Sequence, residues 1–482
     1  MPQPQSRASW DLVLKRFQEI WGYETFRAPQ GEIVQCLLHQ QDALIVMPTG
    51  GGKSICFQLP ALLSQGLTLV VSPLVALMEN QVQELQQKKL AAAVLHSELP
   101  SPQRRKVLWA LENQKLRLLY LSPETLLSEP VWQRLCQPNL SINGLILDEA
   151  HCLVQWGDTF RPAYRRLGAV RPALLRHKPE GTKLAIAAFT ATANPQAQQT
   201  IRSVLQLQQP QMFLQNPYRA NLSLAVSIAW SARGRRQQLL RYIQSKPQQA
   251  GLVYVRTRRD GEELAAWLGQ QGYPTAAYHA GLGAKERRSL ETDWLTGKLL
   301  FVVCTSAFGM GINHPHVRWV IHYHVPTLLS EYVQEVGRAG RDGKSAEALS
   351  LVSEPTGWLD NEDKQRQQFF IQQNSKHQQV AQALVKQIPR QGDVVSISRQ
   401  FKEGAIALSL LHSMGQLEWL DPFHYAIKQG EVKARSPQNQ AAQEMSRYLT
   451  TRQCRWQFIL NAFGFADVEA LTTGCGHCDR CC

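Results

Sequence analysis

The sequence Met47-Pro48-Thr49-Gly50-Gly51-Gly52-Lys53-Ser54 follows a short apolar run and opens a segment with helical periodicity. Three consecutive glycines let backbone N–H groups approach a chain of phosphates without clashes from Cβ atoms. We expect Lys53 to reach the β- and γ-phosphates of ATP and the Ser54 hydroxyl to bind Mg²⁺. The strict motif has glycine at the position of Met47, but the strand–loop–helix context still predicts a nucleotide-binding loop. The loop residues expected around the phosphates are Thr49, Gly50, Gly51 and Gly52.

Two carboxylates end another apolar run, Leu145-Ile146-Leu147-Asp148-Glu149. Carboxylate oxygens suit Mg²⁺, so Asp148 is expected to complete the magnesium site with Ser54. Glu149 is then placed to orient and deprotonate the water that attacks the γ-phosphate. An isolated Asp-Glu pair is usually a solvated strand end, but together with the upstream loop it indicates ATP hydrolysis.

Apolar runs separated by segments with helical periodicity recur between residues 42 and 352. They are continuously apolar rather than alternating, which is typical of parallel strands covered on both faces. We therefore expect an α/β fold with two tandem, doubly wound parallel-sheet lobes, residues 1–205 and 206–352, joined by the Gln- and Pro-rich linker Leu205–Leu222. The runs are Asp42–Met47, Leu67–Ser72, Ala91–His96, Leu116–Ser122, Gly144–Glu149, Lys183–Thr190, Gly251–Thr257, Thr275–His279, Lys298–Thr305, Val317–Val325 and Ala348–Val352.

The pattern changes after Ser353, where a polar, Gln-rich stretch runs to Lys376. The order that follows is helix, strand, helix and hairpin, predicted at His377–Ile388, Val394–Ser398, Ala405–Met414 and Glu418–Lys428. This order fits a small winged-helix unit, and an ordinary helical connector fits it equally well. We assign residues 353–453 to this connector and residues 454–482 to a zinc-binding module, which gives a small α+β or helical C-terminal region.

The second lobe carries paired arginines in the stretch Gln334-Glu335-Val336-Gly337-Arg338-Ala339-Gly340-Arg341. Arg338 and Arg341 are three residues apart and would share a face if the segment is helical. Arginines from a second lobe stabilise the charge that develops during phosphoryl transfer when the cleft closes. We expect both arginines to act in catalysis and Gln334 to contact the nucleotide.

Cysteines gather at the C-terminal end of the chain, which has Cys454 followed by Cys475, Cys478, Cys481 and Cys482. Cysteines separated by two intervening residues, with a further thiolate on a preceding helix, suit a tetrahedral, structural Zn²⁺ site. The expected ligands are Cys454, Cys475, Cys478 and Cys481. Cys482 could replace Cys481, His477 could compete, and reduced cysteines without metal are the alternative.

The chain has 52 Lys and Arg against 38 Asp and Glu, a net charge of +14. This excess favours a polyanionic partner, most often nucleic acid, although a merely soluble basic surface is compatible with it. No apolar run approaches the roughly 18 residues of a membrane helix, and the N-terminus lacks the apolar region of a secretory signal. Membrane and exported proteins are therefore not expected.

These motifs together resemble those of superfamily 2 helicases, and the chain is similar to RecQ-type DNA helicases in particular. The stretch from His151 to Tyr164 is similar to the aromatic-rich loop of that family. The segment Gly22–Gln30 is similar to its adenine-recognition segment, which implies that Tyr23 stacks on the base and that Arg27 and Gln30 contact the adenine region. The resemblance runs from about Trp10 to Val352, resumes at Cys454 and implies RecA-like lobes. Further matching motifs are Val71–Leu74, Leu121–Glu124, Thr190–Ala193, Tyr278–Gly281 and Ala307–Asn313.

The aromatic loop also has a physical interpretation of its own. Trp156, Phe160 and Tyr164 recur at four-residue spacing, which is more often a core stripe. However, the loop contains Trp156-Gly157-Asp158, which interrupts a helix, and arginines at 161, 165 and 166 interleave with its aromatics. Aromatic faces beside guanidinium groups suit unstacked bases. The residues expected to bind DNA, or to couple it to ATP hydrolysis as the resemblance implies, are His151, Trp156, Phe160, Arg161 and Tyr164.

Some features depart from the family pattern. His324 and Val333 stand where an acidic residue and a second tyrosine are common, and the family often continues beyond the zinc module into a winged helix. This chain ends at Cys482. In the family, that winged helix is the usual wedge between the strands. Its absence leaves open a translocase or annealing factor that separates strands poorly.

We therefore expect an ATP-dependent DNA helicase that couples ATP hydrolysis to 3′→5′ movement along a single strand and to duplex unwinding in recombination and repair. The polarity is implied by the resemblance alone. ATP, Mg²⁺ and Zn²⁺ are the expected cofactors, and single-stranded and tailed duplex DNA the expected substrates. The alternatives are the weakly unwinding translocase, an RNA-stimulated ATPase and a non-catalytic nucleic-acid clamp. A monomer is expected, in a bacterial cytoplasm with its nucleoid or in a eukaryotic nucleus.

Overall fold

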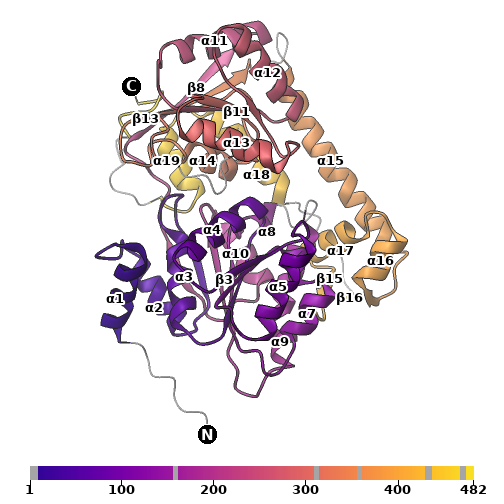
Figure 1. Ribbon diagram of the computed structural model, residues 1–482. Coiled ribbons are helices and arrows are strands. Elements are labelled where there is room, and N and C mark those ends of the chain that lie inside the picture. The colour runs from indigo at the N-terminus through magenta and orange to yellow at the C-terminus, as the bar shows by residue number, and fades with distance from the viewer. Residues whose placement is uncertain are drawn as a thin grey trace. The chain divides into compact units, whose positions relative to one another are not determined.

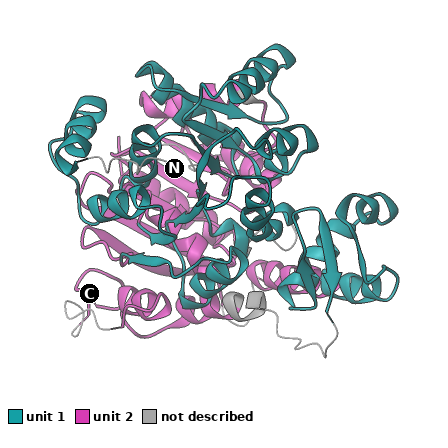
Figure 2. Cartoon of the chain, turned by 90° about the horizontal axis from the view of Figure 1, so that it is seen from below, with its two compact units in different colours: residues 1–47, 51–215, 377–435 teal, residues 48–50, 216–376, 436–482 magenta. Residues whose placement is uncertain are grey.

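The computed structural model describes residues 9–155, 161–308, 314–354, 361–428, 437–466 and 474–481. The chain divides into two compact units (Figure 2). Unit 1 comprises residues 1–47, 51–215 and 377–435, and unit 2 comprises residues 48–50, 216–376 and 436–482.

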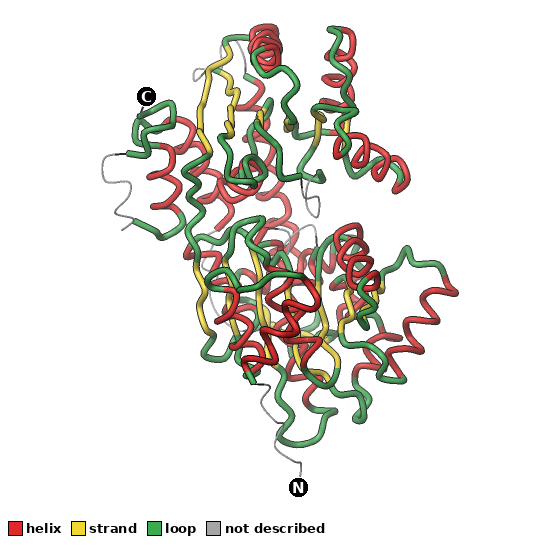
Figure 3. The backbone as a smooth tube through the Cα atoms, turned by 60° about the vertical axis from the view of Figure 1, so that its left-hand side comes forward, coloured by secondary structure: helices red, strands yellow, loops and turns green. Residues whose placement is uncertain are grey.

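Unit 1 contains a seven-stranded sheet in which every strand pairs in parallel, in the order β3-β4-β2-β5-β6-β1-β7. Helices lie against this sheet (Figure 3). The strands are β1 (Ala43–Val46), β2 (Leu67–Val71), β3 (Ala92–Leu95), β4 (Leu118–Leu121), β5 (Ile142–Leu147), β6 (Ala185–Thr190) and β7 (Gln211–Leu214). The helices are α1 (Trp10–Trp21), α2 (Gln30–Leu38), α3 (Lys53–Leu63), α4 (Val75–Gln87), α5 (Ser101–Glu112), α6 (Pro123–Leu126), α7 (Glu129–Leu135), α8 (Cys152–Gln155), the 3₁₀ helix η1 (Pro162–Ala169), α9 (Val170–Leu175) and α10 (Pro195–Val204).

The order of these strands positions the candidate ATP site. Only β6 separates β1, which precedes the glycine loop, from β5, which ends before Asp148. Because the carboxyl ends of parallel strands meet at one edge of a sheet, the loop and the carboxylates are brought to the same edge.

The linker predicted at Leu205–Leu222 is wrong in part. Strand β7 lies inside it and pairs with β1, and β8 begins at Leu222. β7 is an edge strand whose side chains are mostly exposed, so it carries no continuous apolar run that would identify it.

Unit 2 contains a six-stranded parallel sheet in the order β10-β11-β9-β12-β13-β8. Together, the two parallel sheets confirm the predicted fold class. The strands are β8 (Leu222–Ala229), β9 (Gly251–Tyr254), β10 (Ala277–Tyr278), β11 (Phe301–Cys304), β12 (Trp319–His322) and β13 (Ala346–Ser353). The helices are α11 (Ala232–Gln244), α12 (Arg258–Gln270), α13 (Ala284–Leu295), α14 (Leu329–Val336), α18 (Pro437–Thr450) and α19 (Arg455–Ala462), with the first part of α15 (Glu362–Val385).

Residues 377–428 form a small subdomain of unit 1, which we call the insert module. After the end of α15 it contains β14 (Gln391–Asp393), α16 (Val394–Gln400), α17 (Gly404–Ser413), β15 (Leu417–Trp419) and β16 (His424–Ile427). Its three strands pair antiparallel in the order β14-β16-β15. Helices α16 and α17 thus lie between the first strand and the hairpin, which is the order of elements in a winged helix.

The strand predicted at Val394–Ser398 is wrong, because this segment begins helix α16. The Asp393 side chain accepts a hydrogen bond from the backbone N–H of Ser396 at 2.7 Å and caps that helix. A capping interaction of this kind is worth about 1 kcal/mol and outweighs the strand preference of a short β-branched run.

Candidate functional site

The glycine loop turns tightly between β1 and α3. Gly50 and Gly52 have φ values of 85° and 78°, a region that favours glycine. A Cβ atom at Gly52 would lie 2.4 Å from Nε2 of Gln30, and this amide donates a hydrogen bond to the Gly51 carbonyl at 2.9 Å. The loop is therefore shaped both by its glycines and by a buried glutamine from α2.

The segment resembling an adenine site is built around the same glutamine. Oε1 of Gln30 accepts a hydrogen bond from the backbone N–H of Arg27 at 3.0 Å. The Arg27 side chain is exposed, and Tyr23 is 53% exposed with its ring centroid 5.9 Å from that of Phe17. An aromatic ring held on one side and open on the other is available for stacking on a base.

Lys53 and Asp148 lie close together at the carboxyl edge of the sheet. Lys53 is the first residue of α3, and its Nζ donates to the Met47 carbonyl at 3.2 Å. Burial and, to a smaller extent, the Glu149 charge raise the pKa of Asp148 to about 7, although the Lys53 charge opposes both effects. A buried carboxylate beside a lysine fits a site for a cation and phosphates. Ser54 follows Lys53 in α3 and is partly exposed.

Glu149 has a strained backbone, with a φ of 52° that a residue with a side chain rarely adopts. Its Oε2 lies 3.2 Å from Nδ1 of His151. The same nitrogen lies 3.2 Å from Oγ1 of Thr190, at the end of β6. Backbone strain of this kind concentrates at functional sites. Because His151 is buried, it is placed to connect Glu149 to β6 rather than to touch a nucleic acid.

Part of the predicted DNA loop, including Trp156 and Phe160, lies outside the described residues. Nη1 of Arg161 donates to Oε2 of Glu124 at 3.3 Å. Tyr164 is fully buried in the apolar core of unit 1, so its ring is not exposed for stacking on a base. This position therefore follows the core-stripe interpretation of the four-residue spacing.

The paired arginines lie beyond the end of a helix. Helix α14 ends at Val336, and turns follow, with Gly340 at a φ of 62°. Arg338 is buried and Arg341 partly exposed, and Gln334 lies in the last turn of α14. The helical face that the spacing of Arg338 and Arg341 would give is thus not formed.

A buried network that the sequence did not reveal fixes helix α14. Glu335 accepts hydrogen bonds from Nη2 of Arg256 and lies within 2.8 Å of Nε2 of His322. One helix turn before it, Tyr332 accepts a hydrogen bond from the hydroxyl of Tyr448 in α18 at 2.9 Å. These groups come from strand ends and helices far apart in the chain, so no local pattern could have identified them.

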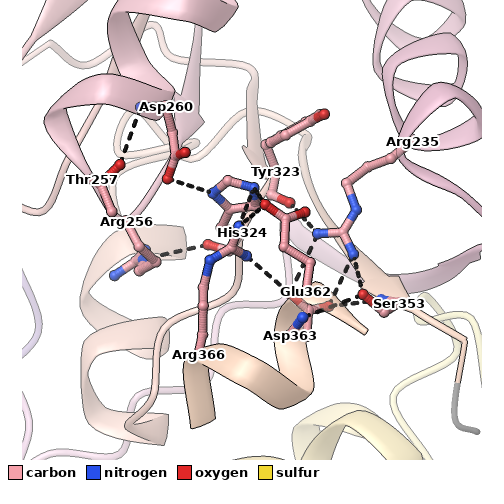
Figure 4. A network of polar contacts seen from close by, with 10 residues as sticks. All are labelled: Arg235, Arg256, Thr257, Asp260, Tyr323, His324, Ser353, Glu362, Asp363 and Arg366. Atoms are coloured by element: carbon pink, nitrogen blue, oxygen red, sulfur yellow. Dashed lines mark hydrogen bonds and ion pairs between the residues drawn. The ribbon is translucent and has the colours of Figure 1, made fainter. Parts of the chain in front are cut away.

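His324, one of the departures from the family pattern, lies buried in a second network (Figure 4). Its Nδ1 is 3.5 Å from Oδ2 of Asp260, and its Nε2 is 3.4 Å from Oε1 of Glu362 and 2.8 Å from Nη2 of Arg366. Burial raises the pKa of Asp260, but hydrogen bonds from His324 and Thr257 outweigh it and lower the value to about 2.

This network is not suited to a metal ion. The two carboxylates face opposite nitrogens of the His324 ring, and the Arg366 guanidinium, which also bonds Glu362, provides the positive charge. The network instead holds the start of α15 against the end of β12. His324 is therefore explained by partners from α12 and α15 rather than by the nucleotide.

Four thiols gather at the C-terminal end of unit 2. The sulfur atoms of Cys454, Cys475, Cys478 and Cys481 lie within 4.8 Å of one another. Three of their separations are 3.5, 3.9 and 4.0 Å. Tetrahedral zinc with bonds of about 2.3 Å would place its sulfurs about 3.8 Å apart, so the thiols fit this ion. Cys482 lies outside the described residues.

The surroundings of the thiols hold them in this arrangement. Gly474 has a φ of 96°, and a Cβ atom there would lie 2.8 Å from the Cys481 sulfur. Cys454 precedes α19, whose Arg455 donates to Asp479 at 2.8 Å. Nδ1 of His477 lies 2.6 Å from the Cys475 carbonyl, a contact to the backbone rather than to the thiols. The cluster is thus tied both to helix α19 and to the terminal loop, residues 474–481.

Three family models match the chain: DEAD/DEAH box helicase over residues 27–201, helicase conserved C-terminal domain over 234–343 and RecQ zinc-binding over 413–482. Among solved structures, Dbp5 of S. cerevisiae bound to RNA and ADP BeF3 aligns with a TM-score of 0.57 at 18% identity, over 72% of this chain and 88% of that one. Mss116 bound to single-stranded RNA aligns with a TM-score of 0.58 at 17% identity, over 73% and 76%. At these identities the likeness shows the fold alone.

None of the described helices combines the length and apolar composition needed to cross a bilayer.

The chain is 54% identical to the ATP-dependent DNA helicase RecQ of Synechocystis sp., over 98% of both chains. It is 37% identical to the RecQ helicase of Haemophilus influenzae, over 72% of this chain and 54% of that relative. With the three matched domains and the likeness over nearly its full length, this chain belongs to the RecQ family of ATP-dependent DNA helicases.

Proposed function

We propose that this protein uses ATP hydrolysis to move 3′→5′ along single-stranded DNA and to unwind duplex ahead of it, in recombination or repair. The observation that carries the proposal is the group at the carboxyl edge of the unit 1 sheet. There a buried Asp148 lies near Lys53, and the strained Glu149 contacts His151. Family membership supports DNA as the substrate.

Each residue of this group has a distinct role in the proposed reaction. Lys53 and the loop from Thr49 to Gly52 hold the phosphates of ATP, and the Tyr23 ring stacks on the base beside Arg27 and Gln30. Ser54 and Asp148 would hold Mg²⁺, which supplies positive charge to the phosphates. Glu149 takes the proton of the attacking water.

Unit 2 supplies the arginines. Arg338 and Arg341 are proposed to stabilise the negative charge that develops on the γ-phosphate, with Gln334 touching the nucleotide. The buried partners of Glu335 support this role, because they hold the end of α14 directly before the arginine turn.

Zinc, held by Cys454, Cys475, Cys478 and Cys481, is proposed to be structural. Four protein ligands leave no open position for chemistry. We also propose that the protein acts as a monomer on single-stranded and tailed duplex DNA, in the cytoplasm with the nucleoid.

Strand displacement tests the proposed activity. A duplex with a single-stranded 3′ tail should be separated when ATP and Mg²⁺ are present, and a duplex with a 5′ tail should not. Glu149→Gln serves as the inactive control, and an RNA duplex with the same sequence tests the RNA alternative. ATP hydrolysis that is stimulated by DNA without any displacement would contradict unwinding and indicate a translocase.

Replacing Trp156 with Ala tests the coupling role of the aromatic loop. We expect hydrolysis without DNA to stay unchanged, while its stimulation by single-stranded DNA is lost, because a stacking aromatic contributes about 1–3 kcal/mol per base. Hydrolysis would be measured against increasing oligonucleotide concentration, with the exposed Trp109→Ala of α5 as the matched control. Full stimulation of the Trp156 variant would contradict the coupling role.

A further inference from the structure

The insert module packs against lobe residues that directly follow the aromatic loop. Helix α17 contacts η1. Ala169 at the end of η1 belongs to the same apolar cluster as the buried Leu408 and Leu411 of α17. In helix-turn-helix proteins the second helix of the pair enters a DNA groove. Here that helix is α17, and its apolar surface is covered by protein.

One arginine of η1 bonds to the module, and a second is buried and acts electrostatically on it. Nη1 of Arg166 donates to the Pro422 carbonyl at 3.2 Å. Arg165 is buried, and its charge assists burial in lowering the pKa of His412, in α17, to about 3, with Lys428 adding to the effect. The alternation of arginines and aromatics, which suggests DNA contacts, therefore serves protein packing at positions 165 and 166.

An aromatic contact joins the hairpin of the module to α7. The ring centroids of Trp132 and Phe423 lie 5.3 Å apart with an edge-to-face angle of 74°. Phe423 also packs against the apolar core of unit 1. Figure 1 shows β16 beside α7, in agreement with this contact.

Another part of η1 is fixed by the lobe itself. A Cβ atom at Gly168 would lie 1.8 Å from the Val204 carbonyl at the end of α10, so only glycine permits this approach. Segment η1 therefore has α10 on one side and the insert module on another. It begins at Pro162, one residue after Arg161 and close to the C-terminal end of the aromatic loop.

We propose that the insert module is a clamp that positions the C-terminal end of the aromatic loop, with Phe423 and Arg166 as its main positioning residues. The proposal rests on the coupling role of the loop. Without the clamp, the C-terminal end of the loop keeps its own anchors, such as the buried Tyr164, but loses the support of the module, and DNA binding is transmitted less well to Glu149. The module thus serves the DNA dependence of hydrolysis rather than hydrolysis itself.

Truncating Phe423 to Ala tests the clamp in the full-length protein. We expect stimulation by single-stranded DNA to fall about five- to tenfold, the lower end of the usual range for coupling between sites. Hydrolysis without DNA should stay unchanged, which a general loss of structure would not allow. Phe423→Leu should restore most of the stimulation, and Leu420→Ala, in an exposed position of the same hairpin, is the matched control.

A second pair of variants keeps the test decisive if Phe423→Ala folds poorly. Trp132→Leu should reproduce the effect from the lobe side. Trp132→Leu with Phe423→Leu should be no worse than Trp132→Leu alone, because the first substitution has already removed the edge-to-face contact. Normal stimulation in Phe423→Ala, when Trp156→Ala has lost it, would overturn the clamp. If the unmodified protein is not stimulated by DNA, or Trp156→Ala is stimulated fully, the proposed coupling fails instead.

Discussion

Replacing Glu149 with Gln is expected to reduce ATP hydrolysis at saturating DNA by about a hundred- to ten-thousandfold, the usual contribution of a general base. The amide has nearly the shape of the carboxylate but cannot accept the proton of the attacking water. The loop, Lys53 and the Tyr23 ring are unchanged, so ATP binding should persist. Steady-state hydrolysis and binding of a fluorescent ATP analogue would separate these two effects.

A matched control for this variant lies in the same lobe. Glu129→Gln makes the same chemical change at an exposed position at the start of α7 and should leave hydrolysis within about twofold, as surface substitutions usually do. If Glu149→Gln hydrolysed ATP at a rate comparable to that of Glu129→Gln, another group would have to accept the proton of the attacking water. The strained φ of 52° would then need a different explanation.

The sequence was informative wherever a residue's role depends on its near neighbours. Runs such as Leu67–Ser72 are apolar because their strands are covered on both faces, so their positions could be read directly. The glycine loop is equally local, since Gly52 and Lys53 act at one turn. The cluster of four thiols was also accessible, because three of its cysteines lie within seven residues and only Cys454 is distant.

The sequence was less informative wherever the partners are distant or the burial is partial. Strand β7 escaped detection because an exposed edge strand needs no apolar run. The segment Val394–Ser398 has the composition of a strand, but the cap from Asp393 and the burial of Val394 and Ile397 favour a helix. His324 could be noticed as a departure but not explained, because Glu362 and Arg366 come from a helix about forty residues later.

Replacing Cys478 with Ser is expected to remove zinc from the protein and to destabilise unit 2 as a whole. Cys478 is buried, and its sulfur accepts the backbone N–H of Arg455 at the start of α19. Structural zinc contributes an apparent free energy of about 10–16 kcal/mol in small zinc-dependent domains, so losing one of four thiolates is costly. Metal content would be measured by mass spectrometry on freshly purified protein, with about one zinc per chain expected before substitution.

The destabilisation should spread beyond the thiols because the zinc module is part of the apolar core of unit 2. Trp456 and Ile459 of α19 share a buried cluster with strands β8 and β9, and Nε1 of Trp456 donates to the Leu222 carbonyl at 2.9 Å. Asp479 accepts the backbone N–H of Val226 at 3.0 Å, which ties the terminal loop to the same edge strand. Thermal unfolding should therefore show an early transition in Cys478→Ser but not in Cys136→Ser, whose thiol lies outside the cluster. A Cys478→Ser protein that keeps its zinc, or that loses it without any change in unfolding, would contradict a structural role for the metal.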